Sequence, residues 1–349
     1  MTHTTSADPR LAALQHWLDT LATPFGLHPN TLTPVSGDAS FRRYFRVQSD
    51  TGPRIVMDAP PPQEDCTPFI DIAQRLTRGG LQVPEIFAQE LSLGFLLISD
   101  LGSQTFYEAI QNGATQDDTT WQQHMRGALQ ALVKMQKCPA GGLPAYDAAR
   151  LVQELQLFPQ WYLQVHHQHT PNDATLNALA QIFELLAQQA AAQPQVFVHR
   201  DYHSPNLMLG AGAPDYIPGI IDFQDAVCGP ISYDIASLVM DARTTWDEPT
   251  QLDWAIRYWE YARDARLPVP ADFAQFHMHY EWMSLQRNLR ILGVFARLSH
   301  RDGKHHYLDH IPRVLAYVQQ VAGRYQPFRP LLRLLDQLDD QPRQDGYSF

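Results

Sequence analysis

The segment formed by residues 196–222 constrains the fold more than any other part of this chain. It reads VFVHRDYHSPNLMLGAGAPDYIPGIID, in which an apolar run precedes a polar loop and two further apolar stretches. The run at 196–198 predicts a strand, and the loop after it places Asp201 and Asn206 five residues apart. The later stretches, separated by glycines and a proline, predict a short hairpin whose arms bring Asn206 and Asp222 to the same end.

Three polar side chains of this segment have the chemistry needed to handle magnesium and phosphate. Mg²⁺ prefers oxygen ligands, usually one or two from side chains and the rest from nucleotide phosphates and water. Asn206 and Asp222 can each supply such an oxygen, and Asp201 can accept a proton from an incoming hydroxyl group. The segment therefore predicts a phosphotransferase centre in which Asp201 is the catalytic base and Asn206 and Asp222 hold the metal.

The same residues resemble the motifs of the kinase-like aminoglycoside phosphotransferase superfamily. The matching features are the tripeptide His199-Arg200-Asp201, Asn206 five positions later, the hairpin, and Asp222 between Ile221 and Phe223. A lone tripeptide would be a weak indication, but this combination of spacings is specific. The resemblance implies an α+β, bilobal, protein-kinase-like fold with a small antiparallel-sheet N-lobe and a large, mostly helical C-lobe. It also implies that the chain uses ATP and Mg²⁺.

Motifs outside the loop resemble one family within that superfamily. They lie at 37–46, 57–61, 221–226 with 229–230, and 285–288 onward to 301–303, and the similarity extends from about residue 10 to about residue 335. The family consists of bacterial kinases that phosphorylate N-acetylmuramate and N-acetylglucosamine at the anomeric C1 hydroxyl in peptidoglycan recycling. The resemblance implies that the partners of the chain are a small amino sugar and a nucleotide.

Composition limits the classes of protein to which the chain can belong. With 349 residues, of which 44% are hydrophobic and 18% charged, the chain can bury one large core or two smaller ones. The formal net charge of −11 argues against nucleic acid as the main partner, because binding to phosphate backbones needs clustered Lys and Arg. No apolar window has the length of a membrane span, and the first residues do not resemble a signal peptide, so we expect a cytoplasmic protein.

The spacing of apolar residues in the first third of the chain predicts a small sheet with helices packed on it. Helical patterns occur at 10–22 and 69–78. Short stretches typical of strands occur at 41–47, 54–57, 85–89 and 95–98.

Long helical patterns dominate after residue 103 and indicate a second lobe. We therefore expect an N-lobe over 1–98, a hinge at 99–102, a C-lobe over 103–338 and a flexible tail over 339–349. Helices of the C-lobe are expected at 121–136, 151–166, 174–191, 233–242, 252–264 and 273–298.

A stretch rich in small residues at 37–40 lies where kinases place the turn whose backbone N–H groups face the nucleotide phosphates. The strand after it has no lysine, and the first lysine of the chain is Lys134. Any cation that the first lobe supplies to the phosphates must then be an arginine, and strand alternation puts Arg42 and Arg46 on one face and Arg43 on the other. The residues expected to contact the nucleotide are Ser40, Phe41, Arg43 and Arg46, with Ser99, Asp100 and Leu101 of the hinge receiving adenine.

The missing lysine leaves a nucleotide-binding pseudokinase open as an alternative. The sequence also leaves undecided which acidic residue of the helix orients the phosphate-binding cation. Glu64, Asp65 and Asp71 all lie in the expected region. The presence of Asp201, together with the two predicted metal ligands, favours an active enzyme.

Recognition of the acceptor is expected to use the loop and the last long helix. The residues expected to contact the acceptor are His203, Asp225, Gln286 and Arg287. An arginine suits the lactyl carboxylate of N-acetylmuramate, whereas a pocket for a cationic aminoglycoside would carry acids. A kinase for aminoglycosides or for another small-molecule hydroxyl group stays an alternative. Asp234 is expected to support the loop or to cap a helix.

Overall fold

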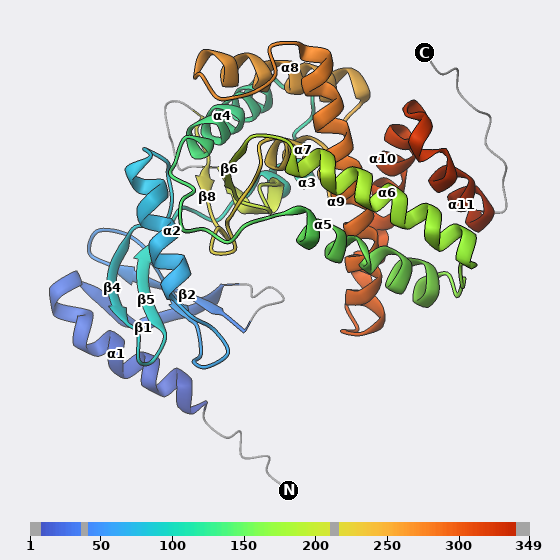
Figure 1. The fold of residues 1–349 in the computed structure, drawn as a ribbon. Coiled ribbons are helices and arrows are strands. Elements are labelled where there is room, and N and C mark those ends of the chain that lie inside the picture. The colour runs from blue at the N-terminus through green and yellow to red at the C-terminus, as the bar shows by residue number, and fades with distance from the viewer. Residues whose placement is uncertain (1–7, 36–40, 210–215, 340–349) are drawn as a thin grey trace, which may run out of the picture. The chain divides into compact units, whose positions relative to one another are not determined.

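The computed structural model describes residues 8–35, 41–209 and 216–339, and the chain divides into two compact units (Figure 1). The N-terminal unit consists of Met1–Ser103 together with Gly219–Gln224, and the C-terminal unit contains the remaining residues. The assignment of Gly219–Gln224 to the first unit was not anticipated from the sequence. Asp222 is therefore assigned to the N-terminal unit, whereas Asp201 and Asn206 are assigned to the C-terminal unit.

The N-terminal unit contains a five-stranded antiparallel sheet with the strand order β1-β2-β3-β5-β4. The small antiparallel sheet predicted from the sequence is therefore present. The strands are β1 (Leu27–Val35), β2 (Arg43–Ser49), β3 (Arg54–Asp58), β4 (Ile86–Glu90) and β5 (Phe95–Ser99).

Strand β1 was not predicted, because it contains Pro29 and Pro34 and lacks a clear alternation of apolar residues. Proline cannot donate a hydrogen bond to a neighbouring strand, so it normally argues against a strand. The position of β1 at the end of the strand order explains the exception, since an edge strand pairs on one side only.

The two faces of this sheet are covered by different helices. Helix α1 (Pro9–Phe25) packs Leu14 and Leu18 into one core with Phe45 and Val47 of β2. Because neighbouring residues of a strand point to opposite faces, Tyr44 and Arg46 lie on the face turned away from α1. Figure 1 shows helix α2 (Thr67–Arg78) on the side of the sheet opposite to α1.

The C-terminal unit is mostly helical, as predicted. Its centre is the long helix α9 (Phe273–His300), which is buried along most of its length. Its two short strands β6 (Gln195–Val198) and β9 (Val227–Pro230) pair antiparallel, and strand β7 (Leu207–Met208) follows the loop. The other helices are α3 (Phe106–Gln111), α4 (Thr119–Gln136), α5 (Ala148–Leu155), α6 (Asp173–Ala191), α7 (Tyr233–Val239), α8 (Glu248–Asp264), α10 (Ile311–Arg324) and α11 (Arg329–Asp339).

The single helix predicted over 151–166 is wrong, because α5 ends at Leu155 and a π-helix, η1 (Phe158–His166), follows. Pro159 lies in the first turn of η1, where its missing N–H and the restriction on the preceding residue interrupt a regular α-helix. Gly293 of α9 lies against this junction, and a Cβ atom there would be only 2.3 Å from the carbonyl carbon of Leu157. The break therefore allows an unusually close approach to α9.

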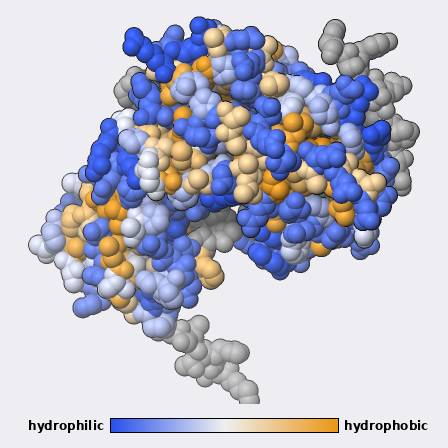
Figure 2. Space-filling model, in the orientation of Figure 1, coloured by the Kyte–Doolittle hydropathy of each residue, from blue (hydrophilic) through white to orange (hydrophobic). Residues whose placement is uncertain are grey.

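The visible surface is mainly hydrophilic, with apolar residues scattered between charged ones (Figure 2). Among the described residues, no helix combines the length and apolar character needed to cross a membrane.

Candidate active site

Strand β6 delivers the polar loop 199–206, as predicted from the apolar run before it. Val196, Phe197 and Val198 are buried, and Val198 pairs with Val227 of β9. The loop ends in a short 3-10 turn, η2 (Ser204–Asn206). The strand thus fixes the start of the loop in the core, and His199, His203, Ser204 and Asn206 of the loop stay buried.

Asp234 of α7 holds the first half of the loop. Its carboxylate accepts hydrogen bonds from the backbone N–H of His199 at 2.7 Å and of Arg200 at 3.0 Å. Asp234 is fully buried, and this burial raises its pKa to about 7 against the opposing effect of the two hydrogen bonds. Arg200 has a φ of 76°, a left-handed conformation that non-glycine residues seldom adopt. The two hydrogen bonds help to hold this backbone, and the expected supporting role of Asp234 is confirmed.

A second buried carboxylate, Asp241, holds the second half of the loop. It accepts hydrogen bonds from the backbone N–H of Ser204 at 2.9 Å and from the hydroxyl of the same residue. Burial acts to raise the pKa of Asp241, but His203, Arg243 and Ser204 outweigh it and hold the pKa well below its usual range. Helix α7 ends at Val239, before the residue 242 that the sequence predicted, and Asp241 lies in the segment after it.

The side chain of Asn206 has a fixed orientation. Its Nδ2 donates to the backbone carbonyl of Asp201 at 2.9 Å and lies 3.2 Å from Nε2 of His203. Since both contacts use the nitrogen, the amide oxygen of Asn206 points away from them. His203 is buried between Asn206 and Arg243, so the structure gives it a supporting position, while its predicted contact with the acceptor stays a prediction.

Several basic side chains act electrostatically on Asp201. Burial acts to raise the pKa of Asp201, but His203, Arg290, Arg287 and Arg200 together lower it to about 2. The carboxylate is therefore ionised at neutral pH and can act as a hydrogen-bond acceptor.

Two of these arginines share a counter-ion, Glu154 of α5. Its carboxylate binds Nη2 of Arg200 at 2.7 Å and Nε of Arg290 at 2.9 Å. The hydroxyl of Tyr146 donates to the same carboxylate. The guanidinium groups of Arg200 and Arg290 are thereby held next to the loop by a residue that the sequence did not identify.

Gln286 and Arg287 of α9 are buried and incompletely hydrogen-bonded. Arg287 is 2% exposed, and within the described chain its Nε and Nη1 have no hydrogen-bond partner. Gln286 is fully buried, and neither polar atom of its side chain has a partner among the described residues. Buried polar groups of native proteins usually have partners, so such exceptions often indicate a ligand. The structure brings Arg287 close enough to lower the pKa of Asp201, whereas Asp225 is exposed.

In the N-terminal unit, Asp222 follows β8 (Gly219–Ile220) in a left-handed conformation with a φ of 61°. Its Oδ1 accepts a hydrogen bond from Nε2 of Gln224 at 2.8 Å, and its side chain is exposed. The next residue, Phe223, is buried and packs on Phe69 of α2 with ring centroids 4.9 Å apart. The buried ring thus fixes the backbone that presents the carboxylate of Asp222.

The predicted nucleotide-binding residues of the N-terminal unit lie in different environments. Ser40 lies outside the described residues, and Phe41 is 68% exposed. Arg43 lies on the face covered by α1, and Arg46 binds Asp100, as detailed below. The structure therefore gives both arginines carboxylate partners, and their predicted contact with phosphate stays untested.

The predicted hinge is well ordered by local hydrogen bonds. The backbone N–H of Ser99 donates to Glu85, and its hydroxyl accepts from the N–H of Glu85, both at 2.9 Å. Asp100 accepts from the N–H of Gly102 at 2.9 Å. The predicted adenine contacts of these residues and of Leu101 stay predictions.

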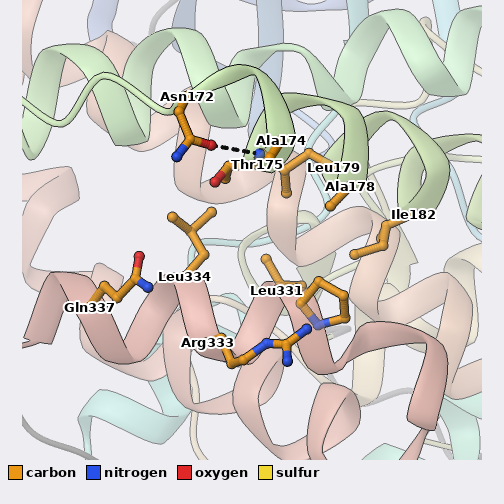
Figure 3. A pocket seen from close by; sticks show the side chains of 11 residues that line it. Asn172, Ala174, Thr175, Ala178, Leu179, Ile182, Leu331, Arg333, Leu334 and Gln337 are labelled. Atoms are coloured by element: carbon orange, nitrogen blue, oxygen red, sulfur yellow. Dashed lines mark hydrogen bonds between the residues drawn. The ribbon is translucent and has the colours of Figure 1, made fainter.

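A separate hollow of about 260 Å³ lies between α6 and α11 (Figure 3). Leu179 and Ile182 face Leu331 and Leu334 across it, and Asn172 caps α6 at its edge. None of the predicted site residues lines this hollow, so we do not assign it to the candidate active site.

Comparison with known proteins bears on both the chemistry and the fold. Residues 31–273 match the model of a family described as "Phosphotransferase enzyme family". A Pseudomonas aeruginosa protein named N-acetylmuramate/N-acetylglucosamine kinase is 44% identical over 341 residues, which cover 95% of this chain and 97% of the relative. A Neisseria meningitidis protein with the same name is 39% identical and covers 97% of this chain and 99% of its own length.

Solved structures support the predicted protein-kinase-like fold. The ethanolamine kinase of Plasmodium vivax has a TM-score of 0.59 and 11% identity, covering 88% of this chain and 87% of that one. The ADP-bound aminoglycoside phosphotransferase APH(2'')-Ib has a TM-score of 0.56 and 11% identity, covering 88% and 98%. At this level of identity the similarity shows the fold alone.

Proposed function

Because the chain belongs to the phosphotransferase enzyme family, we propose that it is an ATP-dependent sugar kinase acting on N-acetylmuramate and N-acetylglucosamine. The position phosphorylated is the anomeric C1 hydroxyl, and the reaction serves peptidoglycan recycling in the cytoplasm, where ATP is available. The choice of sugars is supported by the names of the two relatives, which are 39–44% identical over nearly their whole length.

The observation that carries the proposal is the environment of Asp201. Its carboxylate is ionised, lies in a loop held by Asp234 and Asp241, and has its pKa lowered by three arginines. In phosphoryl transfer the protein mainly positions the reactants and stabilises charge. Asp201 accepts a hydrogen bond from the sugar hydroxyl and orients its oxygen for attack. With a pKa of about 2 it is a weak base, so proton transfer completes late, when bond formation to phosphorus has made the hydroxyl acidic.

Asn206 and Asp222 fit the proposed Mg²⁺ site in chemical type. Asn206 uses its amide nitrogen for contacts within the loop, and its amide oxygen is the proposed ligand of the cation. Asp222 offers an exposed carboxylate. A bound Mg²⁺ would neutralise charge on the phosphates of ATP.

Arg287 and Gln286 are the proposed acceptor-binding groups of α9. A carboxylate such as the lactyl group of N-acetylmuramate would satisfy the unpartnered donors of Arg287, and the amide of Gln286 suits sugar hydroxyl or acetamido groups. A polycationic aminoglycoside would meet the positive charge of Arg287 instead, whose Nε and Nη1 have no hydrogen-bond partner among the described residues. Arg287 therefore favours an amino sugar over an aminoglycoside.

A substrate comparison tests this proposal. Release of ADP is followed with the purified protein, MgATP and N-acetylmuramate, N-acetylglucosamine or kanamycin as the acceptor. We expect turnover with both sugars and none above background with kanamycin. Turnover with kanamycin alone would support the aminoglycoside alternative, and nucleotide binding without turnover on any acceptor would support the pseudokinase alternative.

A further inference from the structure

The N-terminal unit must supply a cation for the phosphates of ATP if the proposed function is correct, and β3 has no lysine for this task. Three arginines lie together at the start of β2, namely Arg42, Arg43 and Arg46. Their positions on the sheet and their partners distinguish them.

Arg43 lies on the face of the sheet that α1 covers. Its Nε and Nη2 donate to Oδ2 of Asp58 at 2.8 and 2.6 Å, and its Nη1 donates to Asp8, the N-cap of α1. Asp58 is fully buried, so this ion pair is part of the packing between α1 and the sheet. These ion pairs hold Arg43 on the face covered by α1, whereas Tyr44 lies on the opposite face of the sheet.

Arg46 lies on the same face as Tyr44 but is bound to the hinge. Its Nε donates to Oδ2 of Asp100 at 2.5 Å, and its Nη2 donates to the carbonyl of Gly102 at 3.2 Å. The side chain of Asp100 is 4% exposed, so separation of this pair would leave a buried carboxylate without its counter-ion. Arg46 therefore connects β2 to the hinge.

Arg42 forms a different kind of pair. Its Nη2 lies 2.9 Å from Oε2 of Glu64, which lies three residues before the start of α2, and the two side chains are 11% and 16% exposed. The pair lies near Asp222, because Arg42, Glu64 and Asp222 all act electrostatically on the buried hydroxyl of Tyr44. Burial is the main reason why the pKa of Tyr44 is raised to about 12. The pair and the proposed metal ligand thus share one side of one unit.

We propose that Arg42, oriented by Glu64, binds the β- and γ-phosphates of ATP in place of the missing lysine. This assignment rests on the proposed function. In protein kinases the same task belongs to a lysine held by a glutamate of the neighbouring helix, and here Glu64, in the segment leading into α2, holds Arg42. A guanidinium group has five donors in a planar fork, so Arg42 can keep Glu64 on one side and still offer N–H groups to two phosphate oxygens.

Nucleotide binding without sugar separates this assignment from an effect on transfer. The dissociation constants of MgATP and of AMP, which lacks the β- and γ-phosphates, are measured by isothermal titration for the wild type, Arg42→Ala, Arg42→Lys and Glu64→Gln. We expect Arg42→Ala to weaken MgATP binding about ten- to a hundredfold, since charge-assisted hydrogen bonds are lost, and to change AMP binding less than twofold. Arg42→Lys restores part of the loss, and Glu64→Gln produces a smaller loss than Arg42→Ala.

The matched control is Arg75→Ala, which removes an arginine of the same unit that pairs with Asp71 on the surface of α2 at 2.9 Å. It should change neither dissociation constant by more than twofold. The assignment is overturned if Arg42→Ala and Arg42→Lys both bind MgATP within twofold of the wild type, or if AMP and MgATP weaken equally. Circular dichroism shows whether each variant is folded. If Arg42→Ala does not fold, the dissociation constant of MgATP for Arg42→Lys tests the assignment. An inactive wild type that binds MgATP would contradict the proposed function without touching this assignment.

Discussion

At the scale of single residues, the local sequence supplies the reactive groups and distant residues set their charge. Asp201 comes from the loop, but Glu154, Arg287 and Arg290 lie on other helices. The spacing of Asp201 and Asn206 could be read from the sequence because both belong to one loop. Glu154 and Asp241 could not, since no spacing signal connects a buried carboxylate with a partner tens of residues away.

The role of Asp201 leads to a first prediction. Asp201→Asn should lower turnover by about a hundredfold or more, the usual effect of removing a general base, while MgATP and sugar dissociation constants change by less than about fivefold. Steady-state kinetics and titration calorimetry measure the two quantities. Asp173→Asn, at the exposed start of α6, is the control and should leave both unchanged. Near wild-type turnover of Asp201→Asn would refute the assignment of the base.

The same residue predicts a pH dependence of stability. Because the pKa of Asp201 is lowered to about 2 in the folded protein, its ionised form stabilises the fold above the unfolded pKa, and this contribution is lost as pH falls toward 2. At neutral pH the shift corresponds to about 2 kcal/mol. Urea unfolding of the wild type and Asp201→Asn should show the variant less stable at pH 7 and the difference smaller at pH 3. A difference that grows on acidification would contradict the lowered pKa.

Replacement of Gln286 is predicted to raise stability, whereas Asp201→Asn is predicted to lower it at pH 7. Its two polar atoms are buried without partners among the described residues, so Gln286→Leu removes a desolvation cost of about 1 kcal/mol and should raise Tm by about 2–4 °C. The KM for the sugar should rise at the same time. Gln136→Leu is the contrasting variant, because Gln136 is buried but bonded to Ile231 and Tyr258, and it should lower Tm. A fall in Tm for Gln286→Leu would show that Gln286 stabilises the free protein.

At the scale of elements, the sequence predicted the helices and strands whose apolar residues form a regular local pattern. The strands at β2, β3, β4 and β5 and the helix α2 were predicted because their apolar residues alternate or recur with the helical period. Two misses have physical causes that lie outside the segment concerned. Strand β1 tolerates its prolines because it is an edge, and η1 breaks from α5 where the chain meets α9.

The contact between η1 and α9 leads to a prediction about glycine. In Gly293→Ala the new methyl group would lie 2.3 Å from the backbone of Leu157, so η1 and α9 must move apart. We expect the free energy of unfolding to fall by about 1–3 kcal/mol. Each kcal/mol lowers Tm by about 2–4 °C. Gly323→Ala in α10 meets nothing within 4 Å and should be neutral or stabilising by up to about 1 kcal/mol. Thermal unfolding of both variants checks the pair. Equal melting temperatures would mean that η1 and α9 are not in close contact.

At the scale of the whole molecule, the two-lobed organisation follows from a change in pattern near residue 100, and the sequence was enough to predict it. The inclusion of Gly219–Gln224 in the N-terminal unit was not predictable, because it depends on contacts such as that of Phe223 with Phe69. The face of the sheet that each arginine of β2 occupies was likewise not predictable from the sequence alone. Alternation predicted that Arg43 and Arg46 lie on opposite faces, but only the packing of α1 showed which face belongs to Arg43.

The most direct test of the central claim identifies the product of the reaction. The wild-type protein is incubated with MgATP and N-acetylglucosamine or N-acetylmuramate, and the product is examined by phosphorus NMR with proton coupling. We predict a sugar phosphate whose phosphorus couples to the anomeric proton for both sugars, formed at least about a hundredfold faster than by Asp201→Asn. A phosphate on another hydroxyl group, or no sugar phosphate from a protein that binds MgATP, would contradict the account.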